Sequence, residues 1–198
     1  LGTADDAGDI AIERRDSVRP PATLGQRKTW HLHRLDPRSG AYNLSGAFRL
    51  QGPLDVGILR DVLRGFVQRH AVLRTHFSDG DGGDSPAAEV LDDVGVELAV
   101  HDLSDVPAER RAAALTEFLE AAASDPIDIE AGPPFRYALV RLAPEHHALL
   151  VVHHAIVWDG WSFDVFLTEL KVGYESRQGL GPAPAALPIQ FGDYAAWE

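Results

Sequence analysis

The chain of 198 residues contains no cysteine and no methionine. The lack of cysteine excludes disulfide bonds and a thiol nucleophile, and it fits a cytoplasmic protein. No apolar run approaches the roughly 18 residues of a membrane-spanning helix, and no signal peptide is recognisable. We therefore expect no membrane partner. Because an initiating methionine is also lacking, we expect that the chain was cut from a longer protein.

Positive charge is scarce, with 18 Lys and Arg against 30 Asp and Glu and a net charge of −12 at pH 7. This balance argues against nucleic acid as a partner. Basic residues gather between Arg14 and Arg38, whereas the stretch from Asp79 to Asp105 is acidic and has no Lys or Arg. Solvated surfaces are the simplest interpretation of both, and a docking surface for an acidic carrier domain is the alternative for the basic stretch.

The composition, 45% hydrophobic and 24% charged, is that of a globular domain that can bury a core. Residues 1–21 are polar and end in two prolines, which predicts a linker, and residues 22–198 form the folded part. The remaining pattern predicts strands at 42–50, 88–91, 97–100, 135–142 and 147–153, and helices that begin near Thr23, after Asp55, at Pro107 and at Trp161.

One stretch organises the chain. The apolar run Leu149–Val152 leads into His153, His154 and Ala155, and an Asp159-Gly160 turn follows before a helical pattern. A buried strand that delivers polar groups to a turn is a common way to build a site.

This stretch resembles the HHxxxDG motif of nonribosomal peptide synthetase condensation domains, which belong to the chloramphenicol-acetyltransferase-like acyltransferases. Three other segments resemble motifs of the same family in the same order: 23–32, 69–77 (RHAVLRTHF) and 190–197 (QFGDYAAW). The resemblance implies an α/β two-layer sandwich with a mixed, mainly antiparallel sheet and flanking helices. It covers one lobe of two, so it also implies that a C-terminal lobe completes the domain.

Aligned on Asp159-Gly160, the family's first histidine falls on His154 and its second, the catalytic one, on Ala155. The alternative alignment, with His153 and His154 as the pair, needs an extra residue in the turn. We therefore expect impaired catalysis, because alanine cannot act as a base, and the sequence leaves open whether Ala155 is natural or engineered.

Three further residues complete the expected site. The resemblance makes Asp159 a structural carboxylate held by an arginine, with Arg74 as the candidate within this chain and an arginine of the absent lobe as the alternative. Asp159 is also placed to be a helix N-cap, and the two roles can coexist. Gly160 is expected to allow a turn and the approach of a substrate. Trp161, like Trp158, is expected in the core rather than against a substrate.

His153, directly before the motif, resembles the additional histidine of the β-lactam-forming condensation domain of nocardicin biosynthesis. That resemblance implies dehydration of a seryl donor, addition of the acceptor amine and ring closure, with His153 as an extra base. Neighbouring strand residues point to opposite faces, so His153 reaches a substrate only if the strand bends. A metal site at His153, His154 and Asp159 is the weaker alternative, because no HExxH-like pattern accompanies it.

The resemblance implies amide-bond formation between acyl thioesters on donor and acceptor peptidyl carrier domains, beside the adenylation domain of one megaenzyme that makes an antibiotic or other secondary metabolite. The phosphopantetheine belongs to the carriers, and no cofactor is expected on this lobe. The alternatives are a non-catalytic condensation-like domain that recruits a tailoring enzyme and a stand-alone acyltransferase.

Overall fold

The structure is a computed structural model that describes residues 11–80 and 82–198. Its elements in chain order are α1 (Leu24–Leu35), η1 (Gly40–Tyr42), β1 (Asn43–Gln51), α2 (Val56–Arg69), η2 (Ala71–Arg74), β2 (Thr75–Asp79), β3 (Pro86–Val90), β4 (Leu98–Asp102), α3 (Ala108–Ser124), β5 (Phe135–Ala143), β6 (His146–His154), α4 (Gly160–Arg177) and α5 (Phe191–Trp197).

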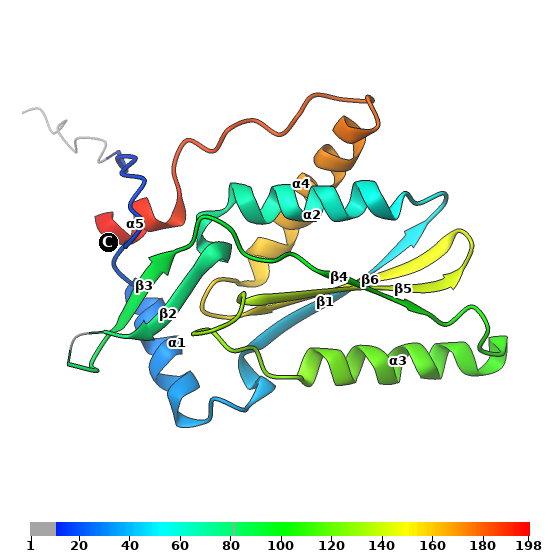
Figure 1. Cartoon of the computed structure of the whole chain (residues 1–198), viewed down its shortest axis with the longest axis horizontal. Helices are drawn as coiled ribbons and strands as arrows, with labels where there is room; N and C mark the ends of the chain where they lie inside the picture. Colours follow the sequence, from blue (N-terminus) through cyan, green and yellow to red (C-terminus); the bar gives the residue numbers. More distant parts are fainter. Residues whose placement is uncertain (1–10, 81) are drawn as a thin grey trace, which may run out of the picture.

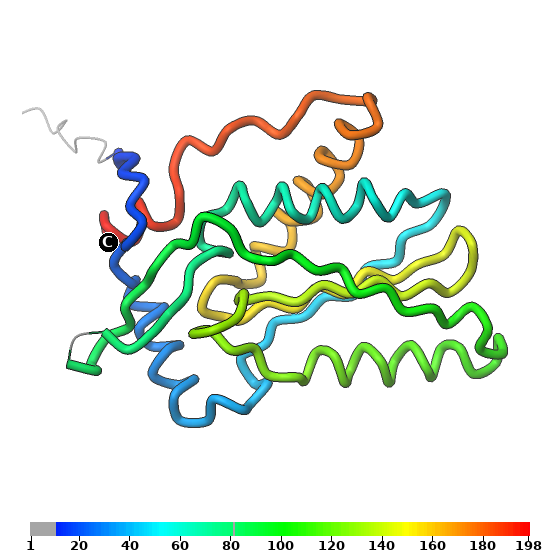
Figure 2. Tube along the Cα trace, in the orientation of Figure 1, coloured from blue at the N-terminus to red at the C-terminus, as the bar shows by residue number. Residues whose placement is uncertain are grey.

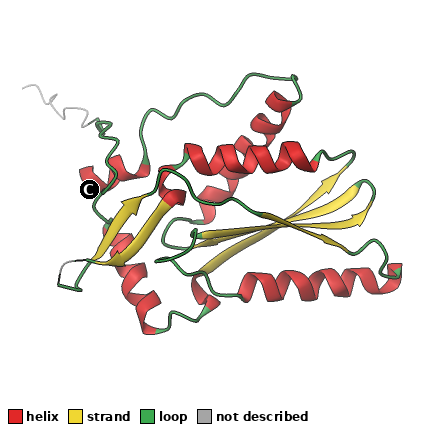
Figure 3. Cartoon of the chain, viewed as in Figure 1, coloured by secondary structure: helices red, strands yellow, loops and turns green. Residues whose placement is uncertain are grey.

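The main sheet has four strands in the order β1-β6-β5-β4, and β2 and β3 form a separate hairpin. Strand β6 pairs antiparallel with β1 and β5, whereas β4 pairs parallel with β5. Helices flank this sheet, with α2 and α4 packed together on one side and α3 running along the other (Figures 1 and 3). The prediction of a mixed, mainly antiparallel sheet with flanking helices is confirmed.

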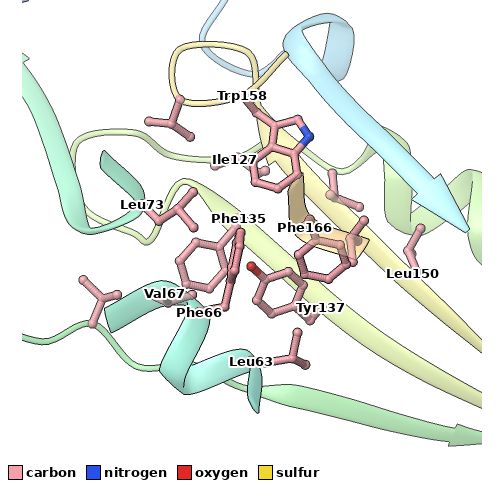
Figure 4. Packing of buried hydrophobic residues seen from close by; sticks show 14 of the residues in the cluster. Leu63, Phe66, Val67, Leu73, Ile127, Phe135, Tyr137, Leu150, Trp158 and Phe166 are labelled. Carbon is pink, nitrogen blue, oxygen red and sulfur yellow. The ribbon is translucent and has the colours of Figure 1, made fainter. Parts of the chain in front are cut away.

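Strand β6 forms the centre of the molecule. Every residue from His147 to His154 is buried, because β6 lies between two strands and has helices on both faces. Aromatic rings from α2, β5 and α4 gather against this strand, together with Trp158 of the turn that follows it (Figure 4). The end of β6, and with it the predicted site, is therefore built on a strand that the packed core encloses.

The helix boundaries follow from capping residues. Thr23 accepts a hydrogen bond from the Gln26 amide in a capping box, and Asp55 accepts one from the Ile58 amide. Helices α1 and α2 therefore begin where the sequence predicts, because each side chain satisfies an amide that has no partner within its helix.

The N-terminal segment and α5 lie side by side (Figure 2). The Arg15 amide donates to Asp193 of α5 at 2.8 Å, and the Val90 amide of β3 donates to the Val18 carbonyl at 2.8 Å. Of the predicted linker, residues 1–10 lie outside the described residues, and the part from residue 11 onward contacts α5 and β3.

Within the described ranges, no helix is both long and apolar enough to span a bilayer. The same residues contain no group of three or more His, Cys, Asp or Glu side chains placed to hold a metal ion.

Two helical glycines give a matched test of the contact between α2 and α4. At Gly65, an added Cβ meets no atom within 4 Å, whereas at Gly173 it would lie 2.9 Å from Cγ1 of Val62. We expect Gly65→Ala to raise the free energy of unfolding by about 0.5–1 kcal/mol, because alanine favours a helix. Gly173→Ala should show no such gain, since Val62 is in the way. Thermal unfolding would measure both, and an equal gain at both positions would contradict close packing of the helices.

Candidate functional site

His153 is fully buried in the aromatic core. Its ring stacks face to face on Trp158, with centroids 3.6 Å apart and planes 6° apart, and its Nε2 lies 3.1 Å from the Tyr137 hydroxyl. Burial lowers the pKa of His153 to about 3. An imidazole with this pKa and no access to solvent is poorly suited to take a proton from a substrate near neutral pH. The stack instead ties the end of β6 to the turn that follows.

His154 points to the opposite face, as the alternation of a strand requires, and contacts α1. Its Nδ1 accepts a hydrogen bond from the Ile156 amide at 3.1 Å, and its Nε2 lies 3.2 Å from Nδ1 of His33. Burial, with the neighbouring His33 ring, lowers the pKa of His154 to about 4. The neutral ring must therefore carry its proton on Nε2 and donate it to His33, which fixes the ring in a structural role.

Ala155 lines a cavity of about 430 Å³ between the start of α1, the end of α2 and the start of α4. Its amide donates to the Tyr42 carbonyl at 2.8 Å, which extends the pairing of β1 and β6 by one residue. Neither His153 nor His154 lines this cavity. Of the three neighbours, Ala155 is therefore the one that lines a space that a ligand could enter.

Asp159 is the N-cap of α4. Its Oδ1 accepts hydrogen bonds from the Ser162 amide at 2.8 Å and the Ser162 hydroxyl at 2.7 Å, and the hydroxyl accepts one from the Asp159 amide at 3.3 Å. Within the described ranges, no arginine or lysine forms an ion pair with Asp159. The local N-cap interpretation thus describes this carboxylate in the present structure.

The prediction that Arg74 holds Asp159 is wrong in this structure. The Arg74 guanidinium donates to three backbone carbonyls, those of Leu91, Asp92 and Gln68. Arg74 therefore joins the end of α2 to the segment after β3, and its charge is used on carbonyl groups instead of a carboxylate.

Gly160 is the first residue of α4, and its φ lies outside the left-handed region. The turn therefore does not require glycine for its backbone conformation. An added Cβ would meet no protein atom within 4 Å, so the space beside Gly160 is open. The approach of a substrate there stays a prediction.

Trp161 is 77% exposed, so the prediction that it belongs to the core is wrong, whereas Trp158 is buried as expected. Phe166 and Leu170 form the inward face of α4. Trp161 precedes Phe166 by five residues, which places it about 140° away around the helix. It therefore stands at the rim of the cavity beside Ala155.

An arginine–glutamate–histidine cluster near the cavity was missed by sequence analysis. Glu169 of α4 accepts from Nε of Arg69 at 3.0 Å and lies 2.9 Å from Nε2 of His70. These hydrogen bonds and charges outweigh burial and lower the pKa of Glu169. The adjacent Arg69 and His70 are part of the RHAVLRTHF segment, but only the contact with α4 reveals their shared partner.

The buried histidines predict that acid destabilises the fold. An unfolded histidine has a pKa of about 6.5, so it takes up a proton as the pH falls below that value, whereas folded His153 stays neutral down to about pH 3. We expect stability to be fully present above pH 6.5 and to decline toward pH 3. His153→Gln should lower the proton uptake on unfolding at pH 5 by about one. Chemical unfolding between pH 7 and 4.5 measures this, with His31→Gln on the surface of α1 as the control, and an unchanged pH dependence would contradict the burial of His153.

The cap at Asp159 gives a second test. Asparagine caps a helix about as well as aspartate, whereas alanine cannot accept the hydrogen bond. We expect Asp159→Ala to lower the free energy of unfolding by about 0.5–2 kcal/mol and Asp159→Asn to leave it nearly unchanged. If thermal unfolding showed an equal loss in both variants, the negative charge rather than the cap would be what stabilises α4.

A family model described as "Condensation domain" matches residues 19–198. A linear gramicidin synthase of Brevibacillus parabrevis is 39% identical over 190 residues, which cover 95% of this chain and 4% of that protein. The chain thus spans a small part of the curated relatives that it matches.

Solved structures of condensation-like domains share the fold of this chain. The X-domain in complex with OxyB, from teicoplanin biosynthesis, gives a TM-score of 0.81 at 33% identity and covers 94% of this chain and 39% of that one. The first condensation domain of the calcium-dependent antibiotic synthetase, in complex with a substrate analogue, gives 0.78 at 26% identity, with 86% of this chain and 40% of that one covered. The family model, the sequence identities and the shared fold together show that the chain belongs to the condensation-domain family of nonribosomal peptide synthetases.

Proposed function

We propose that this chain is the N-terminal lobe of a condensation domain that joins two carrier-bound acyl groups through an amide bond, and that Ala155 impairs the reaction. The observation that carries the proposal is the position of Ala155. Ala155 lines the cavity at the end of β6, at the position where the ungapped alignment places the family's second histidine.

In the proposed reaction, the amine of the acceptor attacks the thioester carbonyl of the donor. The carbon–nitrogen bond forms, the carbon–sulfur bond breaks, the donor's carrier leaves as a thiol, and the amine loses a proton. An imidazole beside the reacting atoms could take that proton, and a positioned base contributes about 10²–10⁴-fold to a rate. The Ala155 methyl group cannot do so. Without a base at this position, the domain could still accelerate the reaction by holding both substrates in reactive geometry.

The partners follow from the same proposal. Donor and acceptor carrier domains would bring their phosphopantetheine arms to the cavity, a C-terminal lobe would complete the channel, and an adenylation domain of the same synthetase would load a carrier. No cofactor is assigned to this lobe itself. The relative from Brevibacillus parabrevis is a synthase of linear gramicidin, which favours a synthetase over a stand-alone acyltransferase. The absence of cysteine supports a cytoplasmic location.

We do not extend the proposal to β-lactam closure. That route would need His153 as an additional base, and His153 is fully buried under Trp158 with a pKa of about 3. The strand does not bend to bring this ring to the cavity.

Recruitment of a tailoring enzyme is the second candidate function. Two observations favour it: the lack of an imidazole at Ala155, and the similarity to an X-domain whose structure was determined in complex with OxyB. In that case the domain would contribute a docking surface, and it would not need to catalyse amide formation.

The test compares the complete domain with its Ala155→His variant. Each receives both carrier-bound substrates, and intact-protein mass spectrometry follows the condensed product. We expect the histidine variant to form the amide about 10²–10⁴-fold faster. Ala155→Asn is the matched control, because it adds a polar side chain without a base and should stay slow.

Three outcomes would count against the proposal. Equal activity with and without histidine would mean that the base lies elsewhere. If neither form made condensed product with a range of donors, the recruitment function would be favoured. If the Ala155 protein formed a product whose mass was lower than that of the amide by one further water, β-lactam closure would be supported.

A further inference from the structure

Several polar groups in the wall of the cavity beside Ala155 already have partners, whereas the buried indole Nε1 of Trp158 has none among the described residues. Thr23 and Gln26 bond each other in the capping box of α1, and Nε2 of the Gln26 side chain also donates to the Ile156 carbonyl at 3.2 Å. Oδ1 of Asp159 accepts both hydrogen bonds from Ser162. An anionic ligand entering here would lose its hydration and meet the neutral Trp158 indole N–H but no Arg or Lys of the described wall, which costs free energy.

The charges near the cavity also disfavour anionic ligands. The carboxylate of Asp159 stands at its rim, and the His70 ring in its wall is bonded to Glu169, whose lowered pKa keeps that group ionised at neutral pH. Arg69, the cation of this cluster, forms an ion pair with Glu169, with Nε of Arg69 and Oε2 of Glu169 3.0 Å apart. No free positive group of the described wall faces an entering carboxylate.

The rest of the wall is apolar and rich in aromatic rings. Its aromatic members come from four separate elements: Phe66, Trp158, Trp161 and Phe191. Trp158 is fixed by its stack on His153, whereas Trp161 stands out at the rim with Phe191 nearby in the same wall. Aromatic rings that surround a space favour another ring through edge and face contacts.

The size of the cavity fits a bulky group. Its volume of about 430 Å³ lies within the range of about 300–1,000 Å³ that is usual for small-molecule sites. Ala155 contributes only a methyl group at the floor, so an imidazole there would fill part of this space. The substitution that removes the base therefore also enlarges the cavity.

We propose that this cavity is a side-chain pocket for an aromatic group without negative charge on one of the acyl substrates, and that Trp161 determines this specificity by forming the outer wall. The identification of the ligand as an acyl thioester rests on the proposed function. The preference for a ring without negative charge follows from the wall itself.

The experiment is isothermal titration of the complete domain with small thioesters, the N-acetylcysteamine thioesters of N-acetylated phenylalanine, alanine and aspartate. We expect the phenylalanine compound to bind at least about tenfold more tightly than the other two. Trp161→Ala should remove most of that preference. Trp197→Ala, which deletes an exposed tryptophan outside the cavity wall, should retain it.

Ala155→His separates this proposal from the proposed function. We expect it to weaken the binding of the phenylalanine thioester, because the imidazole occupies the floor of the cavity. Equal affinity for all three compounds, or an unchanged preference in Trp161→Ala, would overturn the pocket. A clear aromatic preference in a domain whose Ala155→His variant forms no amide would uphold the pocket and reject the condensation function.

Discussion

The stack of His153 on Trp158 joins the two halves of the candidate site. On one side is β6, which is buried on both faces and holds His153 with the hydroxyl of Tyr137 at 3.1 Å. On the other is the turn that carries Ala155 to the wall of the cavity and leads to the start of α4. Because Trp158 lies flat on His153, the turn cannot swing away from the sheet without exposing two buried rings. The burial of a large apolar side chain stabilises a fold by about 1.5–3 kcal/mol.

This arrangement gives three consecutive residues three different roles. His153 serves the core, His154 is held by Ile156 and His33, and Ala155 faces the cavity. A histidine in this motif is therefore not a base by virtue of its residue type. The direction of its side chain and its solvation decide the role, and both buried rings are held neutral with pKa values of about 3 and 4. Under the proposed function, the position that would act on a substrate is Ala155, which carries a methyl group.

Local signals made much of the fold predictable. Thr23, Asp55 and Asp159 each precede a helical pattern and each caps the helix that follows, since a cap is an interaction within a few residues. The apolar run before His153 predicted a buried strand, and β6 is the central one. The family membership was also predictable, because several motifs occur in the right order.

Long-range contacts were not predictable in the same way. Arg74 meets the carbonyls after β3 rather than Asp159, and this depends on where the β2-β3 hairpin returns. The partner of His154, His33, lies 121 residues away, so no local pattern links the two. Trp161 is exposed because it lies on a side of α4 that does not pack against the core. The sequence of the first helical turn alone does not show which side of the helix packs. Of these residues, Trp161 lines the cavity beside Ala155.

The most direct measurement of the central claim, that Ala155 leaves an imidazole-sized vacancy at the point of catalysis, is chemical rescue with free imidazole. The complete domain would be given both carrier-bound substrates and increasing imidazole, with Ala155→Leu as a variant that fills the space without supplying a base. We predict a saturable rise in the rate of amide formation for the Ala155 protein and none for the leucine variant. An equal response of both proteins, or no response of either while the Ala155→His variant is active, would contradict the claim.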